Sequence, residues 1–303
     1  MNHKMDERNK FLKMSSIYKN EKLSKYNWFN LGGPAKLFIK IDKIEELKNF
    51  LLENNTNDAK IHILGAGSNT LFRDGGFDGF VIKLGNNFSY TKLIKNDEIE
   101  VGAATIDKKL SDFATENSLT GFEFLSCIPG SVGGSITMNS GCYGEDISKI
   151  FLSLKAMNFK GEIINLNRDQ IKFFYRGNSL KNDLIILNVI FKGKKLDKKK
   201  ILEKQQHLIN KKKESQPTRV KTCGSTFKNP LNNKKAWELI KLSKCLDLKV
   251  GDASISEKHS NFFINNGNAN SSDIESLINK VKERVFEKTG IKLELEIKII
   301  GKK

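Results

Sequence analysis

Residues Gly121–Ser135 have the sequence GFEFLSCIPGSVGGS, and Thr137–Gly144 continue it as TMNSGCYG. Glycine is denser here than packing alone requires, although every glycine costs conformational entropy on folding. Such density is typical of a backbone that approaches a ligand closely. A flexible linker is the alternative, but the interleaved Phe, Leu, Ile, Val and Met side chains favour burial. The stretch therefore predicts a folded, ligand-binding region in the middle of the chain.

Strand and helix patterns surround this stretch on both sides. A helix with apolar residues at helical spacing is expected from Ser272, with Gly290 as its stop signal. Alternating apolar and charged residues predict a last strand over Leu293–Ile299. The mixture predicts an α+β fold with mixed sheets. Further strands are expected at 61–64, 80–84, 99–103, 152–157, 162–166 and 184–191, and helices at 42–52, 105–117 and 198–213.

The composition is that of a globular protein with a strong basic excess. The formal net charge is +17, which is compatible with a polyanionic partner. Only six of the 52 basic residues are arginines, the residues that read base edges with a planar fork. We therefore expect no nucleic-acid partner and a monomer, although a basic nucleic-acid-binding protein with flexible glycine segments stays as the alternative.

Targeting and metal signals are absent from the sequence pattern. The first ten residues are polar, and no apolar run is long enough to cross a bilayer. The four cysteines and four histidines do not show metal-ligand spacing. These features predict a cytoplasmic protein with reduced thiols, no membrane insertion and no metal site.

A second glycine segment follows the expected strand 61–64 directly. Its small residues allow backbone N–H groups to approach a diphosphate, and its hydroxyl and amide side chains can donate further hydrogen bonds. An ordinary strand-to-helix turn is the alternative, and the full dinucleotide motif G-x-G-x-x-G is lacking. The residues of this segment are Gly65, Ala66, Gly67, Ser68, Asn69 and Thr70.

A third segment, Cys223–Pro230, has the sequence CGSTFKNP. It gathers a hydroxyl, a lysine and an amide around Gly and Pro, which suits an anion-binding catalytic loop. A polar surface turn explains the same residues when the segment stands alone.

Together these segments resemble one family. The order FNLGGPA (29–35), GAGSN (65–69), IPGSVGG (128–134), GSTFKNP (224–230) and EIKIIG (296–301) is similar to that of the UDP-N-acetylenolpyruvoylglucosamine reductases, and HSNFFIN (259–265) is a further family segment. The resemblance covers nearly the whole chain, in the shorter form that lacks a substrate-capping insertion. Another FAD-dependent oxidoreductase of the same cofactor fold is the alternative, because the glycine segments suit such enzymes too.

The resemblance implies a two-part FAD-binding region of the vanillyl-alcohol-oxidase/PCMH type, at about 28–193, and a C-terminal α+β substrate-binding domain. The expected divisions are 1–85, 86–195 and 196–303. FAD would be bound non-covalently, NADPH would donate the hydride, and the substrate would be a nucleotide sugar. The cofactor-binding residues implied are those of the second segment together with Pro129, Gly130, Ser131, Val132, Gly133, Gly134, Asn139 and Gly141.

The implied reaction explains three further residues. Hydride addition to C3 of an enolpyruvyl group leaves negative charge at C2 and in the adjacent carboxylate, and positive charge and donors stabilise it in the transition state. By resemblance, Arg176 supplies that positive charge, Glu296 acts on the same carboxylate or enolic oxygen, and Ser225 donates the proton to C2. Substrate contacts are implied for Tyr175, Lys228 and Asn229.

The sequence departs from the family pattern after Arg176. The family has serine two residues later, whereas this chain has Asn178 followed by Ser179. Either Asn178 replaces the hydroxyl or the loop is shifted by one residue, so the contacts of both side chains are open.

Overall fold

The computed structural model describes residues 16–54, 60–230 and 234–303 of the chain. These residues form two compact units, each assembled from separate stretches of sequence. The first unit contains 16–19, 37–54, 60–66 and 79–210, and the second contains 20–36, 67–78, 211–230 and 234–303. The glycine segment that follows residue 64 is therefore divided between the units, with the change after Ala66.

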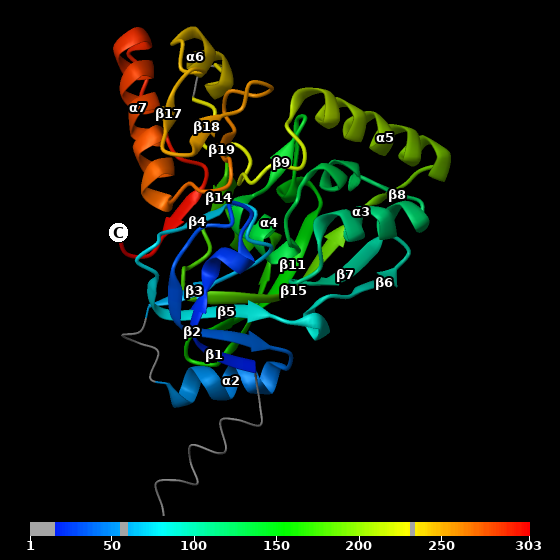
Figure 1. Ribbon diagram of the computed structural model, residues 1–303. Helices are drawn as coiled ribbons and strands as arrows, with labels where there is room; N and C mark the ends of the chain where they lie inside the picture. Colours follow the sequence, from blue (N-terminus) through cyan, green and yellow to red (C-terminus); the bar gives the residue numbers. More distant parts are fainter. Residues whose placement is uncertain (1–15, 55–59, 231–233) are drawn as a thin grey trace, which may run out of the picture. The chain divides into compact units, whose positions relative to one another are not determined.

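A four-stranded sheet with the order β1-β2-β5-β3 belongs mostly to the first unit (Figure 1). Helix α2 (Ile44–Glu53) packs against it, because its Leu47, Phe50 and Leu51 share one hydrophobic core with apolar residues of the sheet. Strand β3 runs parallel to β5 and leads into the glycine segment. The strands are β1 (Ser16–Lys22), β2 (Pro34–Ile41), β3 (Ile61–Ile63) and β5 (Phe77–Leu84).

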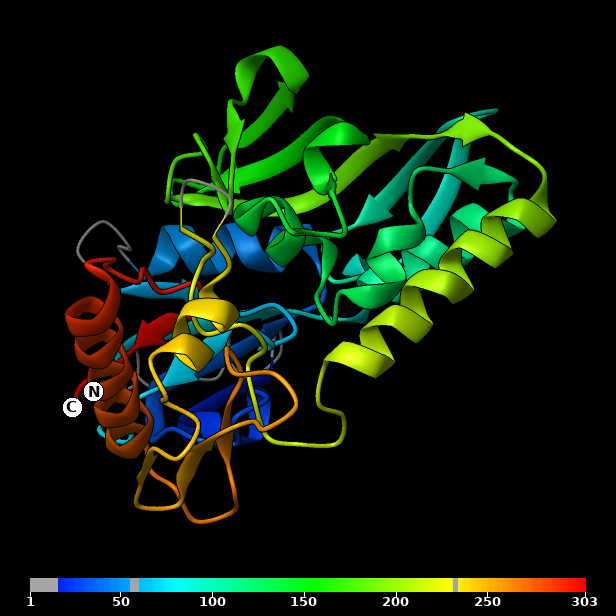
Figure 2. The ribbon, with the colours of Figure 1, turned by 90° about the horizontal axis from the view of Figure 1, so that it is seen from above.

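A five-stranded antiparallel sheet, in the order β12-β11-β15-β7-β6, is the larger sheet of the first unit (Figure 2). Val101, Val189 and Leu154 lie directly opposite one another on adjacent strands, and all three enter the core with α3 (Asp107–Glu116) and α4 (Val132–Met138). The strands are β6 (Thr91–Lys95), β7 (Glu98–Gly102), β11 (Phe151–Asn158), β12 (Ile163–Asn167) and β15 (Leu184–Lys192).

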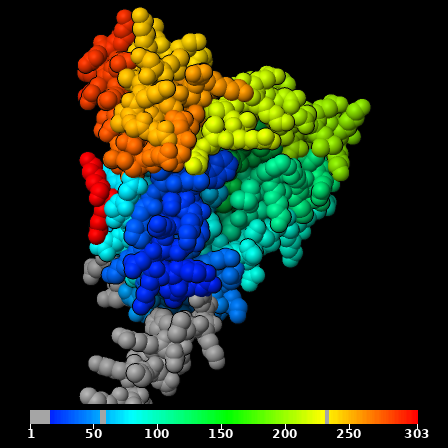
Figure 3. Space-filling view, in the orientation of Figure 1, coloured from blue at the N-terminus to red at the C-terminus, as the bar shows by residue number. Residues whose placement is uncertain are grey.

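Short elements connect these layers. The strand pairs are β9 (Gly141–Cys142) with β10 (Glu145–Asp146), β13 (Phe173–Phe174) with β14 (Gly177–Asn178), and β8 (Leu119–Thr120) with β16 (Lys194–Lys195). The 3-10 turns are Leu23–Tyr26, Asn86–Phe88, Glu123–Cys127, Ile147–Lys149 and Arg168–Gln170. Helix α5 (Lys198–Ser215) exposes most of its lysines and lies at the surface as the yellow-green segment in Figure 3.

The second unit is organised around α7 (Ser271–Thr289). The expected apolar positions of this helix, from Ile274 to Val285, are buried, and Gly290 ends it in a left-handed conformation with φ of 69°. Its core also contains α6 (Ala236–Leu242) and the sheet β17-β18-β19, with bounds Lys249–Val250, Ala253–Ile255 and Phe263–Asn265.

The last strand is shorter than expected. Strand β20 covers only Lys298–Ile300 and runs parallel to β4 (Thr70–Phe72), while Leu295 forms a single bridge with Phe227. The expected alternation is still present, since Leu293 and Ile297 are buried. The segment contacts two different partners in turn, so regular strand pairing covers only its end.

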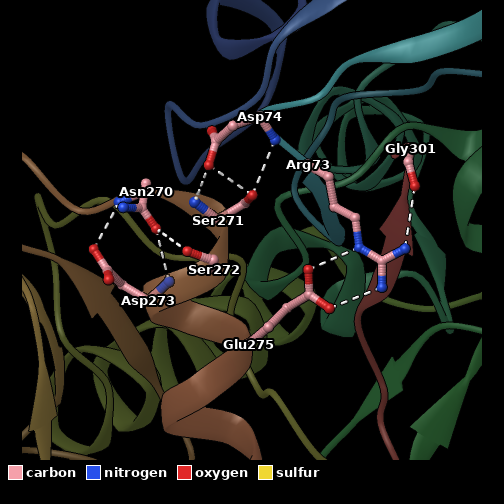
Figure 4. A network of polar contacts seen from close by, with 8 residues as sticks. All are labelled: Arg73, Asp74, Asn270, Ser271, Ser272, Asp273, Glu275 and Gly301. Carbon is pink, nitrogen blue, oxygen red and sulfur yellow. Dashed lines mark hydrogen bonds and ion pairs between the residues drawn. The ribbon is translucent and has the colours of Figure 1, made fainter. Parts of the chain in front are cut away.

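A polar network fixes β4, β20 and the start of α7 within the second unit (Figure 4). Arg73 follows β4 and forms a two-pronged ion pair with Glu275 of α7, at 2.7 and 2.8 Å, and it also donates to the Gly301 carbonyl at 3.1 Å. Asp74 accepts hydrogen bonds from the backbone N–H and the hydroxyl of Ser271, at 2.6 and 2.7 Å. The network holds together segments that are about 200 residues apart in sequence.

Candidate active site

The glycine-rich stretch of the first unit forms a loop that leads into α4. The N–H of Val132 donates to the Thr105 carbonyl, and the N–H of Gly133 donates to the Ala103 carbonyl, both at 2.9 Å. A side chain at Gly133 would place its Cβ 3.2 Å from Ala103, so glycine permits this close backbone packing. The expected cofactor-binding loop is thus anchored to the end of β7 by its own backbone.

Gly65 brings the two glycine segments together within the first unit. A Cβ at Gly65 would lie 2.5 Å from the hydroxyl oxygen of Ser131. The Ser131 hydroxyl makes no side-chain hydrogen bond within the described part of the chain. A glycine backbone beside a donor hydroxyl suits an anionic diphosphate, so these residues fit the FAD that the sequence predicts.

A buried carboxyl group, Asp107, supports the same loop from behind. Its backbone N–H donates to the Gly130 carbonyl at 3.1 Å, and its Oδ2 accepts a hydrogen bond from the Ser135 hydroxyl at 2.6 Å. Burial raises the pKa of this carboxyl to about 7, while the hydrogen bond from Ser135 acts in the opposite direction. The sequence reasoning missed Asp107, because only its burial distinguishes it from the other acidic residues at helix starts.

Arg176 lies at the tip of the β13–β14 hairpin in the first unit. It adopts a left-handed conformation with φ of 57°, its Nη2 donates to the Gly141 carbonyl at 2.9 Å, and its guanidinium lies 5.0 Å from the centre of the Tyr175 ring. Asn139 joins the same hairpin, since its Nδ2 donates to the Phe174 carbonyl at 3.0 Å. Asn139 and Gly141 thus contact the arginine hairpin, and their cofactor contacts stay predictions.

The contacts of Asn178 and Ser179 are resolved. Asn178 Nδ2 donates to the carbonyls of Ile136 and Thr137 at the end of α4, at 2.7 and 3.2 Å. Ser179 instead accepts a hydrogen bond from the Lys172 backbone at 2.9 Å. Asn178 therefore ties the arginine hairpin to the glycine-rich helix, and Ser179 belongs to the base of the hairpin.

The rest of the second glycine segment, from Gly67 to Thr70, belongs to the second unit. Gly67 has φ of 70°, and a Cβ there would lie 2.0 Å from the Tyr26 carbonyl oxygen. Position 67 thus requires glycine, because the Tyr26 backbone packs too closely for a side chain. Asn69 Nδ2 donates to the carbonyl of Glu296 at 3.1 Å, so one expected cofactor residue touches the expected catalytic glutamate. Ala66 and Ser68, on either side of Gly67 in sequence, are both half-buried.

Ser225 and Glu296 belong to neighbouring extended segments of the second unit. The Glu296 N–H donates to the Thr226 carbonyl at 2.9 Å, next to Ser225, and Phe227 bridges to Leu295. The Ser225 hydroxyl has no hydrogen-bond partner within 16–54, 60–230 and 234–303. Arg176 belongs to the other unit.

Asn261 holds the Ser225 segment in place. Its Oδ1 accepts from the Phe227 N–H at 3.0 Å, its Nδ2 donates to the Phe227 carbonyl at 2.8 Å, and its own carbonyl accepts from Thr226. The Asn261 side chain is buried, and it bonds to the Phe227 backbone as a neighbouring strand would. This residue was not singled out in the sequence, although it lies in the family segment 259–265.

The expected substrate contacts near Ser225 have protein partners. Lys228 Nζ lies 3.8 Å from the carboxylate of Glu294, an exposed pair of small energetic weight. Asn229 Oδ1 accepts a hydrogen bond from the Ala236 N–H at 3.1 Å. Their roles toward the substrate stay predictions.

The described residues contain neither a cluster of metal-ligating side chains nor a membrane-spanning helix. Within these ranges the structure contains no group of three or more His, Cys, Asp or Glu side chains that could hold a metal ion. None of the described helices is both long and apolar enough to cross a membrane.

Two parts of the chain match models of known protein families. Residues 35–167 match an FAD binding domain, and residues 216–300 match the C-terminal domain of UDP-N-acetylenolpyruvoylglucosamine reductase. The fold and the glycine-built loops are therefore those of an FAD-binding oxidoreductase, which confirms the predicted fold class.

Relatives and a solved structure identify the family. The reductase of Pelagibacter ubique (strain HTCC1062) is 49% identical over 92% of this chain and 92% of its own length. That of Rickettsia typhi (strain ATCC VR-144 / Wilmington) is 43% identical over 94% of this chain and 98% of its own. The crystal structure from Thermus caldophilus has a TM-score of 0.82 at 31% identity and covers 95% of this chain and 99% of that one. The chain belongs to the UDP-N-acetylenolpyruvoylglucosamine reductase family.

Proposed function

We propose that this protein reduces UDP-N-acetyl-3-O-(1-carboxyvinyl)-glucosamine to UDP-N-acetylmuramate, with NADPH as hydride donor and non-covalent FAD, in peptidoglycan precursor synthesis. The observation that carries the proposal is the contact between the Ser225 segment and Glu296, with Asn69 bound to the Glu296 backbone. Family membership supports the substrate and the cofactor.

The proposed roles follow from where negative charge develops. When bound, FAD would supply the relay of a hydride from NADPH to C3 of the enolpyruvyl group. Arg176 would hold the substrate carboxylate and stabilise the charge that grows on it, since a guanidinium stays charged and presents parallel donors. Ser225 would give its proton to C2, and Glu296 would contact the same carboxylate or enolic oxygen. The unshared hydroxyl of Ser225 supports its assignment as the donor.

The binding roles are proposed on local geometry. The segment Gly65–Thr70 and the residues from Pro129 to Gly134 would hold the cofactor, together with Asn139 and Gly141. Tyr175, Lys228 and Asn229 would contact the substrate. We further propose a three-part organisation at 1–85, 86–195 and 196–303, and a monomer that acts in the cytoplasm, where NADPH and nucleotide sugars occur.

Anaerobic stopped-flow absorbance tests the proposed function. The purified protein should be yellow, NADPH should bleach its flavin absorbance, and the enolpyruvyl nucleotide should restore it with formation of UDP-N-acetylmuramate. A flavin that NADPH reduces and the enolpyruvyl nucleotide fails to reoxidise would instead support another oxidoreductase of this fold. A colourless protein that binds DNA in a salt-dependent manner would support the nucleic-acid alternative.

A further inference from the structure

Strands β2 and β5 are neighbours in the four-stranded sheet (Figure 1), and each carries a lysine at a position that faces away from α2. Ile39, Ile41 and Ile82 point toward α2 and enter its core. Because side chains alternate between the faces of a strand, Lys40 and Lys83 point toward the other face. Both lysines are half-buried.

The position of Lys83 is fixed by the glycine segment. Its Nζ donates to the Gly65 carbonyl at 2.5 Å. Burial, and to a smaller extent the charge of Lys40, lower the pKa of Lys83, so the two ammonium groups are close enough to repel each other. Within the described ranges, neither lysine forms an ion pair with a carboxylate.

This arrangement is unfavourable for the protein alone. A half-buried ammonium group without a counter-charge loses solvation, and a second cation nearby adds repulsion. Lys108 and Lys192 of the first unit, by contrast, are exposed and pair with nearby carboxylates. An anion bound between Lys40 and Lys83 would offset both costs.

The neighbours of the lysines indicate the kind of anion. The carbonyl that Lys83 contacts belongs to Gly65, whose α-carbon lies against the Ser131 hydroxyl. Two cations, a glycine backbone and a donor hydroxyl suit a phosphate group.

We propose that Lys40 and Lys83, with Gly65 and Ser131, form a phosphate-binding site that holds the diphosphate of FAD. This inference rests on the proposed flavin-dependent function and assigns two residues to the cofactor that the motifs do not contain. The 2′-phosphate of NADPH has the same chemistry and is distinguished in the test.

The test measures FAD affinity of the apoprotein by calorimetry for the wild type, Lys83→Met, Lys40→Met and the control Lys19→Met. Lys19 lies exposed on the edge strand β1 of the same sheet. Each of the first two substitutions should weaken FAD binding roughly 10- to 100-fold and make it less sensitive to salt, because a charge-assisted contact is lost. Riboflavin, which has no phosphate, should bind equally to all four proteins.

The stability of the apoprotein separates binding from a structural role. Methionine removes an uncompensated half-buried charge, so Lys83→Met should unfold at the same or a higher denaturant concentration than the wild type. Weaker FAD binding together with a matching loss of stability would overturn the proposal. Unchanged FAD affinity would overturn the proposal too. If, in that case, KM rose for NADPH and not for NADH, the two lysines would bind the 2′-phosphate of NADPH. A wild-type protein that binds no FAD would overturn the proposed function itself.

Discussion

The glycine-built loop of the first unit and the Ser225–Glu296 pair of the second unit obtain their geometry in different ways. The loop at Pro129–Gly134 is shaped by residues close to it in sequence, from Ala103 to Ser135. The Ser225 segment is held by Asn261 and Glu296, and Glu296 by Asn69, across up to 227 residues. A loop shaped by its own neighbours in sequence suits a cofactor that stays bound. The Ser225 and Glu296 region differs, because its reactive side chains come one by one from segments that are distant in sequence.

Among the substitutions in these two regions, removal of the Ser225 hydroxyl should have the largest effect on activity. Ser225→Ala should slow flavin reoxidation by the enolpyruvyl nucleotide by roughly 10²- to 10⁴-fold, the usual range for loss of a general acid. Flavin reduction by NADPH should be unchanged. The measurement is stopped-flow absorbance of each half-reaction, with Ser215→Ala at the exposed end of α5 as control. Equal slowing of both half-reactions would contradict the proton-donor role.

Arg176→Lys tests the arginine hairpin of the first unit. Lysine lacks the planar fork, so kcat/KM for the enolpyruvyl nucleotide should fall by about 10²-fold, while FAD affinity stays near that of the wild type. Steady-state kinetics and cofactor titration measure the two quantities. Arg284→Lys, at an exposed pair with Asp247, is the matched control and should have no effect. A loss of FAD with normal turnover of the reloaded protein would give Arg176 a cofactor role instead.

Asn261→Ala tests the long-range support of Ser225. The substitution leaves the buried N–H and carbonyl of Phe227 without partners and should lower the free energy of unfolding by about 3 kcal/mol. Denaturant unfolding measures this change. The exposed Asn266 also bonds to backbone and hydroxyl groups, and Asn266→Ala should cost far less. Equal losses for the two variants would show that the Asn261 contacts do not hold the segment.

Asp107→Asn tests the local support of the glycine loop through pH. The folded state raises the pKa of Asp107 from 3.8 to about 7, so folding favours the protonated form. The contribution of this carboxyl to stability is therefore lost as pH rises from about 4 to about 7, and about 3 kcal/mol of it is lost between pH 5 and pH 8. His62, whose pKa is lowered to about 4 by burial, changes stability in the opposite direction over this interval, so the effect of Asp107 is measured as a difference between variants. In unfolding of the apoprotein between pH 5 and pH 8, the wild type and the surface control Asp247→Asn should each lose about 3 kcal/mol of stability relative to Asp107→Asn. The same pH dependence in all three proteins would contradict the assignment to Asp107.

Features that depend on neighbouring residues were predicted from the sequence, whereas features that depend on distant partners were not. The burial of α7 and its end at Gly290 followed from periodicity and one glycine, because both depend on neighbours along the helix. The short helix α4 was not expected, since Gly133 and Gly134 lower helix propensity and only packing against β7 and β15 compensates. Asp107 and Lys83 gave no sequence signal, and Asn261 gave only its place in the family segment 259–265, because the importance of all three arises from burial and from partners distant in sequence.

The sequence by itself determined the α+β class, the glycine-dense segments and the residues that carry the family resemblance, because these depend on residue type and short spacing. Only the tertiary structure decided that Gly67 serves a contact with the Tyr26 backbone, that Asn178 caps α4, and that Asn69 binds the Glu296 backbone. The physical reason is that the hydrogen-bond partners of a residue and its burial depend on which segments pack together in space. The spacing of residues in the sequence does not predict which distant segments these are.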